Sequence, residues 1–261
     1  MKHLAILMAY DGSQFYGWQI QVQTPTVQYC LEKALSEIAK EKVMVVGAGR
    51  TDTGVHAIGQ VAHCDFPVKM TTKQIIDALY SKLPKAIKII DIADVNEDFH
   101  ARYDALTRTY HYIITKYQTP FNYNFKTYLP KYKIEIEKLQ ACIEYFIGEK
   151  DFTSFAKPNP EIKNYICDIK EIQINERKDD IVIKIKANRF LHNMVRRMVG
   201  AMIMVSHKTQ NPNIITQWIE MKKHEQKNYF TAPPNGLYLT KIEYPIDKVS
   251  FTTYISREDW I

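Results

Sequence analysis

Two hydrophobic periods alternate along the chain, and this alternation limits the fold more than any other feature. In the first half, strand-like runs occupy 3–9, 43–46, 58–66, 88–95 and 107–115, and helix-like runs begin at Thr24-Pro25 and cover 71–80. In the second half, helix-like runs cover 136–147, 191–205 and 211–218, and strand-like runs cover 181–185 and 236–244. Strands and helices in both halves predict two α+β lobes.

The boundary between the lobes is expected within 117–133, because this segment is rich in Tyr, Asn, Lys and Pro, as a connector would be. We therefore expect an N-terminal lobe at 1–116, a connector at 117–133 and a C-terminal lobe at 134–261. With 46% hydrophobic and 25% charged residues, the composition argues against intrinsic disorder.

The apolar runs at 4–9 and 198–205 are too short for a membrane-spanning helix or a secretory signal. A cytoplasmic protein is therefore the default expectation. Its four widely separated cysteines are expected to be reduced core residues.

A glycine-rich loop, Gly47-Ala-Gly-Arg-Thr-Asp-Thr-Gly-Val-His-Ala57, is the strongest local signal. Its glycines frame Arg50 and Asp52 directly after a strand, so the backbone can turn sharply and approach a ligand closely. The loop is neither a dinucleotide-binding fingerprint nor a P-loop, because the required third glycine is replaced by Asp52 and no Lys-Ser/Thr pair follows Gly54. Asp52 can be a turn residue bound to its own backbone, or an ionised base or nucleophile beside Arg50.

Clustered arginines point to a ligand that carries phosphates. Six of the eight arginines fall at 50, 102–108 and 189–197, and clustered arginine suits bidentate phosphate contacts. On a strand, Tyr110 shares a face with Arg108, so Tyr110 could stack on an unpaired base while Arg108 reaches the backbone or another carboxylate. A cross-strand aromatic pair is the alternative explanation of Tyr110.

The helix predicted at 191–205 is apolar except where Arg196 and Arg197 interrupt it. A buried guanidinium needs an anionic partner because an unpaired buried charge is costly. Asp52 is a candidate partner for a guanidinium of this helix.

Neither a metal site nor a nucleophilic serine is favoured. His56, His63, Cys64 and Asp65 cluster in the sequence, but their spacing matches no zinc motif, and adjacent Cys64 and Asp65 of a strand would point to opposite faces. Ser154 lacks the neighbouring glycines of a nucleophile elbow.

Seven segments together closely resemble the tRNA pseudouridine synthase A family and follow its order from residue 4 to about 244. The most specific is Gly49-Arg-Thr-Asp-Thr-Gly-Val-His56. The others are Tyr10-Asp-Gly-Ser-Gln-Phe-Tyr-Gly-Trp-Gln19, Phe99-His-Ala-Arg102, Arg108-Thr-Tyr-His-Tyr112, Asp151-Phe-Thr-Ser-Phe155, His192-Asn-Met-Val-Arg196 with Val199-Gly200, and Gly236-Leu-Tyr-Leu239.

The resemblance implies a pseudouridine synthase fold, with two similar α+β lobes whose mostly antiparallel sheets are flanked by helices around a basic cleft. It also implies a homodimer and the isomerisation of uridine to pseudouridine at positions 38, 39 and 40 of the tRNA anticodon stem-loop, with no cofactor and no metal.

The resemblance also assigns roles to single residues. Asp52 matches the essential aspartate, the expected nucleophile, and Tyr110 matches the tyrosine that packs against the target base. Arg50 matches an arginine thought to help extrude the nucleotide, Arg196 the basic partner of the aspartate, and Leu237 an apolar contact of the base pocket. Whether Asp52 attacks the base, attacks the sugar or abstracts a proton stays open.

The chain departs from the family pattern at 157–168, which bears on contacts with the tRNA elbow, and Arg197 receives no role. Two other classes of function stay open from the residues alone. A non-catalytic RNA-binding protein would not depend on Asp52, and a nucleotide-binding phosphotransferase would need magnesium and ATP. Pseudouridylation at another tRNA position or in another RNA is the nearest alternative.

Overall fold

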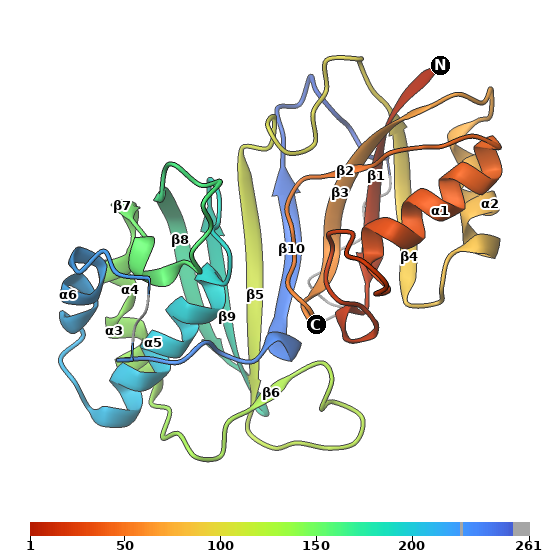
Figure 1. Ribbon diagram of the computed structural model, residues 1–261. Helices are drawn as coiled ribbons and strands as arrows, with labels where there is room; N and C mark the ends of the chain where they lie inside the picture. The colour runs from red at the N-terminus through yellow and green to blue at the C-terminus, as the bar shows by residue number, and fades with distance from the viewer. Residues whose placement is uncertain (225–226, 253–261) are drawn as a thin grey trace. The chain divides into compact units, whose positions relative to one another are not determined.

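The computed structural model describes residues 1–224 and 227–252, which form two compact units (Figure 1). The first unit is Met1–Thr107 together with the segment from Tyr238 onward, and the second is Arg108–Leu237. The last strand of the described residues, which follows residue 236, therefore belongs almost entirely to the first unit. The lobes at 1–116 and 134–261, joined by a connector at 117–133, stay a prediction.

The first unit is built on a sheet in which the strands follow the order β4-β1-β3-β10. These strands are β4 (Ile87–Asp94), β1 (Lys2–Tyr10), β3 (His56–Phe66) and β10 (Leu237–Glu243), and the short β2 (Val46–Gly47) also pairs with β3. All of these pairs are antiparallel except β10 with β3, which are parallel through Tyr238↔His56 and Leu239↔Ala57.

Two helices accompany this sheet, α1 (Val27–Ala39) and α2 (Thr72–Lys82), and they lie beside each other in Figure 1. Helix α1 begins where the Thr26 hydroxyl accepts a hydrogen bond from the Tyr29 amide, and α2 begins with a capping box between Thr71 and Gln74. Each helix buries one apolar stripe, which in α1 contains Val27, Leu31 and Leu35.

Residues 4–10 of β1 are buried on both faces of the sheet. Ala5 and Leu7 belong to a core cluster that also contains Val61 of β3 and Phe99. Partly buried side chains from the end of the chain, including Tyr244, pack against this cluster. This cluster of the first unit therefore lies between the sheet and covering residues from 95–101 and 242–251.

The second unit contains a sheet with the strand order β5-β9-β8-β7. The strands are β5 (Thr107–Thr115), β9 (Asp180–Ala187), β8 (Ile166–Glu176) and β7 (Gly148–Asp151), and they pair antiparallel. The two-residue β6 (Thr127–Tyr128) pairs parallel with the end of β5. The predicted α+β class with mostly antiparallel sheets flanked by helices is confirmed.

The helices of the second unit are α3 (Ile136–Ala141), α4 (Ile143–Phe146), α5 (Met194–Lys208) and α6 (Ile214–Glu220). Helix α5 is the longest and is buried along most of its surface. At Gly200 a Cβ atom would lie 1.9 Å from the Phe230 carbonyl oxygen, so only glycine lets the segment around Phe230 cross the helix this closely.

Several helix boundaries differ from their predictions. The helix predicted to begin at Thr24-Pro25 begins at Val27 instead, because Thr24 pairs with Gln21 in an isolated bridge and Thr26 is the residue that caps α1. The helix predicted at 191–205 begins at Met194, since Asn193 has a left-handed φ of 64° that the interior of a helix does not allow.

The helix predicted at 136–147 is two short helices that meet at Cys142, whose amide bonds the carbonyl three residues earlier in a tightened turn. The helix predicted at 211–218 is α6, which starts later because 211–213 form a turn. The strand predicted at 43–46 is reduced to β2, while the strand predicted at 107–115 is confirmed as β5. The strands β6, β7 and β8 were outside the prediction.

Over residues 1–224 and 227–252, no helix has the length and apolar character needed to cross a membrane. The four cysteines carry free thiols, and Cys64, Cys142 and Cys167 are buried, as predicted for core residues.

Candidate active site

Asp52 begins a tight turn in the glycine loop of the first unit. The Val55 amide donates to the Asp52 carbonyl oxygen at 3.1 Å, and Gly54 has a φ of +79°, the conformation that the third position of such a turn requires. Asp52 is half-buried, whereas Arg50 is exposed and the intervening Thr51 is buried. Asp52 thus stands in a turn closed by a backbone hydrogen bond, and its half-buried side chain lies at the boundary with solvent.

The segment 12–18 clamps this loop through close backbone contacts. The Trp18 amide donates to the Thr51 carbonyl oxygen at 3.0 Å. A Cβ at Gly17, which has a φ of +81°, would lie 2.5 Å from the same oxygen, and a Cβ at Gly12 would lie 2.0 Å from the Val55 carbonyl oxygen. Gly12 and Gly17 are therefore required because segment 12–18 packs directly against the backbone of the glycine loop.

A buried polar network holds the start of the loop. The hydroxyls of Tyr10 and Thr51 are 2.8 Å apart, and the Gln60 side-chain amide donates to the Gly49 carbonyl oxygen at 2.9 Å. Burial raises the pKa of Tyr10 to about 12, although hydrogen bonds with Thr51 and Gln60 act in the opposite direction. Tyr10 is therefore a neutral group whose hydrogen bond with the Thr51 hydroxyl holds the loop against the end of β1.

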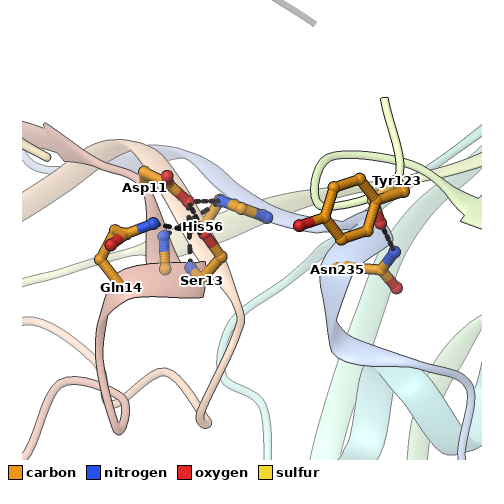
Figure 2. A network of polar contacts seen from close by, with 7 residues as sticks. Asp11, Ser13, Gln14, His56, Tyr123 and Asn235 are labelled. Carbon is orange, nitrogen blue, oxygen red and sulfur yellow. Dashed lines mark hydrogen bonds and ion pairs between the residues drawn. The ribbon is translucent and has the colours of Figure 1, made fainter. Parts of the chain in front are cut away.

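His56 holds the other end of the loop (Figure 2). Its Nδ1 accepts a hydrogen bond from the Gly12 amide at 3.0 Å and lies 3.3 Å from Asp11 Oδ1. The ring stacks on Tyr238, with centroids 4.7 Å apart. Burial alone would raise the pKa of Asp11, but the His56 contact and two hydrogen bonds from Ser13 outweigh it and lower this pKa to about 2.

The remaining predicted residues, Tyr110, Arg196 and Leu237, belong to the second unit. Tyr110 is 8% exposed on β5, opposite Ile185 of β9, and contacts the Phe190 ring edge-on at 5.2 Å. On the same face, Arg108 Nη1 donates to the Asn188 carbonyl oxygen at 2.8 Å. The cross-strand partner of Tyr110 is thus aliphatic rather than aromatic, and its aromatic contact comes from Phe190 beyond the end of β9.

Leu237 follows a single 3₁₀ turn, Pro234–Gly236, and is 4% exposed. The Tyr112 hydroxyl donates to the Pro233 carbonyl oxygen at 2.9 Å, and Asn235 Nδ2 donates to the Tyr123 carbonyl oxygen at 2.7 Å (Figure 2). Burial raises the pKa of the Tyr112 phenol, so this group stays a neutral donor. The position of Leu237 is therefore set by the Tyr112 side chain of β5 and by the backbone of the loop after β5.

Arg196 and Arg197 lie side by side in sequence on α5 but contact different segments. Arg196 Nε donates to the Ala232 carbonyl oxygen at 2.7 Å, and its Nη1 donates to Asn193 Oδ1 at 3.2 Å. Arg197 Nη1 donates to the carbonyl oxygens of Ala156 and His224, at 2.6 and 2.9 Å. Both guanidinium groups are half-buried, and these contacts show that backbone carbonyl oxygens satisfy part of each group.

The residues considered for a metal site have other partners. His63 Nδ1 accepts from the Ala101 amide at 3.0 Å, and burial lowers the pKa of His63 to about 4. Cys64 is buried while Asp65 is exposed, as the strand alternation predicted. Within 1–224 and 227–252, the structure gathers no group of three or more His, Cys, Asp or Glu side chains suited to a metal ion.

Sequence reasoning named the loop residues Arg50 and Asp52 but gave no role to the side chains that hold the loop. Tyr10, Asp11 and His56 lie inside the quoted motifs, so the motif match was the signal that could have found them. Gln60 had no such signal, because a lone glutamine in a strand pattern looks like any half-exposed residue.

A family model described as tRNA pseudouridine synthase matches residues 6–104 and 142–245. Three similar proteins are named tRNA pseudouridine synthase A, and they come from Listeria monocytogenes, Thermoanaerobacter pseudethanolicus and Pseudothermotoga lettingae. They are 37%, 38% and 36% identical to this chain, and each alignment covers 94% of this chain and 100% of the relative. These matches extend over both units of the structure, and the chain therefore belongs to the tRNA pseudouridine synthase family.

Proposed function

We propose that this protein isomerises uridine to pseudouridine at positions 38, 39 and 40 of the tRNA anticodon stem-loop. Membership of the family supports tRNA as the substrate and isomerisation as the reaction. The three positions are proposed from the resemblance of the motifs at 49–56, 108–112 and 236–239. On the same resemblance we propose a homodimer that acts in the cytoplasm.

The reaction breaks the N-glycosidic bond, turns the uracil and joins it to the ribose through a carbon atom. Substrate and product have the same composition, so the chemistry needs no oxidant, reductant or group donor. What the protein must supply is a positioned catalytic group and an environment in which the base leaves its stack, which costs a few kcal/mol.

Asp52 is the proposed nucleophile, and the observation that carries this role is the fixed turn in which it stands. Tyr10 and Gln60 hold the backbone before it, and Trp18 bonds the carbonyl group of its neighbour Thr51. A catalytic group that is held in place before the substrate binds loses little entropy in the transition state. The exposed Arg50, two residues earlier, is proposed to fill the space of the extruded nucleotide.

Tyr110, Arg196 and Leu237 are the proposed substrate-binding residues of the second unit. Tyr110 and Leu237 offer buried, well-packed surfaces of the kind on which a base can stack or rest, and such stacking is worth about 1–3 kcal/mol. Arg196 is proposed as the basic partner of the catalytic carboxylate, and its held guanidinium supports this role.

The segment 116–134 supports RNA binding by a different argument. It contains four lysines and no Asp or Glu, and Lys116, Lys131 and Lys133 are exposed. Tyr117, Phe121 and Tyr123 are 50%, 91% and 53% exposed. Exposed aromatic rings among lysines are typical of surfaces that bind unpaired nucleotides.

The experiment that tests the proposal uses tRNA transcripts whose uridines at positions 38, 39 and 40 are changed singly. The purified protein should form pseudouridine at each intact position, and Asp52→Asn should bind the same tRNA without forming any. Pseudouridine mapped only outside positions 38–40 would reject the proposed specificity. Turnover by Asp52→Asn near the wild-type rate would reject the proposed nucleophile. Wild-type protein that leaves the tRNA unmodified would reject the whole function.

A further inference from the structure

We infer that His56 is a positioning residue for Asp52, and that it acts by joining residues 11–12 to the end of the Asp52 turn through its Nδ1 atom. The inference rests on the proposed function, in which Asp52 is the nucleophile. None of the roles assigned by the resemblance includes His56 or Asp11.

His56 occupies the place where a positioning residue for Asp52 would stand. It is the first residue of β3, directly after the turn from Asp52 to Val55, and it is only 1% exposed. A buried polar ring must be satisfied by hydrogen bonds, because an unpaired buried polar group costs free energy. The polar groups next to Nδ1 are the Gly12 amide and the Asp11 carboxylate.

The Gly12 amide satisfies Nδ1, and this bond ties two backbone segments together. The donor–acceptor distance is 3.0 Å and the contact is buried. Next to it, the Gly12 Cα stands so close to the Val55 carbonyl group that a Cβ would lie 2.0 Å from its oxygen. The hydrogen bond thus holds the side chain of His56 while the close packing meets the carbonyl group of Val55, so Gly12 contacts two adjacent residues at the end of the turn.

Val55 is linked directly to Asp52. The Val55 amide donates to the Asp52 carbonyl oxygen at 3.1 Å, and the turn is completed by Gly54 in the left-handed region. A shift at the end of the turn therefore moves the Val55 amide, to which the Asp52 carbonyl oxygen is hydrogen-bonded. Because misplacement of a catalytic group by about 1 Å can cost about 100-fold in rate, even a small shift would be visible in turnover.

Asp11 and Tyr238 fix the ring itself. Asp11 Oδ1 lies 3.3 Å from Nδ1 and also accepts from the amide and hydroxyl of Ser13, at 3.0 and 2.7 Å. The Tyr238 ring stacks on the imidazole with an interplanar angle of 20°. Because Nδ1 accepts from the Gly12 amide, it does not also donate to Asp11, and Asp11 holds the ring through its place beside Nδ1.

Two amide side chains distinguish this role from simple filling of space. The carbonyl oxygen of asparagine can take the place of Nδ1 and accept from Gly12, whereas glutamine carries its carbonyl group one carbon farther out. His56→Asn and His56→Gln therefore differ mainly in whether the acceptor is in the right place. The substitutions are compared in the full-length protein with an unmodified tRNA transcript, and the rate of a single turnover, the tRNA Kd and the Tm are measured.

We expect His56→Gln to lower the single-turnover rate about 10- to 100-fold while the tRNA Kd stays within about threefold of wild type. His56→Asn should stay within about fivefold of the wild-type rate, because it restores the acceptor.

The inference is overturned if His56→Gln turns over at the wild-type rate. It is also overturned if the Asn and Gln variants lose rate, tRNA affinity and Tm together, since that pattern describes a purely structural histidine. If His56→Gln does not fold, a His56→Asn rate at least tenfold below wild type, at wild-type Tm and tRNA Kd, overturns it as well, because that variant restores the acceptor. Failure of the proposed function looks different, because wild-type protein would then form no pseudouridine or Asp52→Asn would keep the wild-type rate.

Discussion

The hydroxyl of Tyr10 lies 2.8 Å from Thr51 Oγ1, and both side chains are buried. Tyr10 is the last residue of β1, and Thr51 directly precedes Asp52 in the glycine loop. The end of a core strand therefore supports the loop by a side-chain hydrogen bond. This contact explains how a loop with several glycines can still hold one carboxylate in a defined place.

Removal of the Tyr10 hydroxyl should destabilise the protein. In Tyr10→Phe the buried Thr51 hydroxyl loses this partner, and we expect the free energy of unfolding to fall by about 1–2 kcal/mol. Urea denaturation followed by circular dichroism measures the difference. The matched control is Tyr16→Phe, because Tyr16 is 51% exposed and should change the value by less than about 0.5 kcal/mol. Equal effects of the two substitutions would contradict the role of the Tyr10 hydroxyl.

The same phenol should make stability depend on alkaline pH. Burial raises the pKa of Tyr10 from its ordinary value of 10.0 to about 12 in the folded protein. Between these values the unfolded chain releases the proton more readily than the folded one, so its contribution to stability is complete below pH 10 and falls toward pH 12. Tm measured across this range should fall less steeply in Tyr10→Phe than in the wild type. Parallel curves for the two proteins would show that Tyr10 does not contribute.

Glycine is required at position 17 but not at position 49. Gly17→Ala places a Cβ 2.5 Å from the Thr51 carbonyl oxygen at a φ of +81°, so we expect a loss of about 1–3 kcal/mol in unfolding free energy. At Gly49 a Cβ would meet nothing within 4 Å. Gly49→Ala should therefore leave the unfolding free energy within about 0.5 kcal/mol of wild type, and comparable losses in both variants would contradict this account.

Arg197 and Arg50 should respond to substitution in opposite ways. Arg197 Nη1 bonds the partly buried carbonyl oxygens of Ala156 and His224, so Arg197→Met should cost about 1–3 kcal/mol by removing the donor that they share. Arg50 is exposed, so Arg50→Met should leave Tm nearly unchanged and lower pseudouridine formation instead. Calorimetry and a turnover assay on both variants check the contrast, which a stable Arg197→Met protein would disprove.

Binding of tRNA should weaken steeply as salt is added, because each phosphate contact releases counterions. Stacking on the exposed ring of Phe121 should contribute binding free energy that depends less on salt. Phe121→Ala should therefore weaken tRNA binding by about 1–3 kcal/mol. Tyr80→Ala is the control, since Tyr80 is 76% exposed on α2 rather than on the lysine-rich segment. Fluorescence anisotropy with labelled tRNA at several salt concentrations measures both effects. A flat salt response, or equal losses for Phe121→Ala and Tyr80→Ala, would argue against this surface.

The local hydrophobic pattern was enough to predict those helices and strands whose tertiary contacts match the pattern. The alternation at 107–115 predicted β5 with its correct bounds, and the apolar stripe of residues 194–203 predicted the buried side of α5. It failed where a single backbone conformation decides a boundary. Asn193 adopts a left-handed φ, which asparagine permits but which its presence in the sequence does not predict. Thr26 rather than Thr24 caps α1 because the preceding turn ends at Thr24.

The sequence by itself determined the α+β class, the family and the candidate residues Arg50 and Asp52, because periodicity and motif order are written locally along the chain. Only the tertiary structure decided what fixes those residues in place. The contacts of Thr51 with Tyr10 and of His56 with Gly12 join positions 41 and 44 residues apart. Such pairings depend on which strands lie side by side and in which register, and a register is settled by the packing of the whole sheet rather than by any one segment.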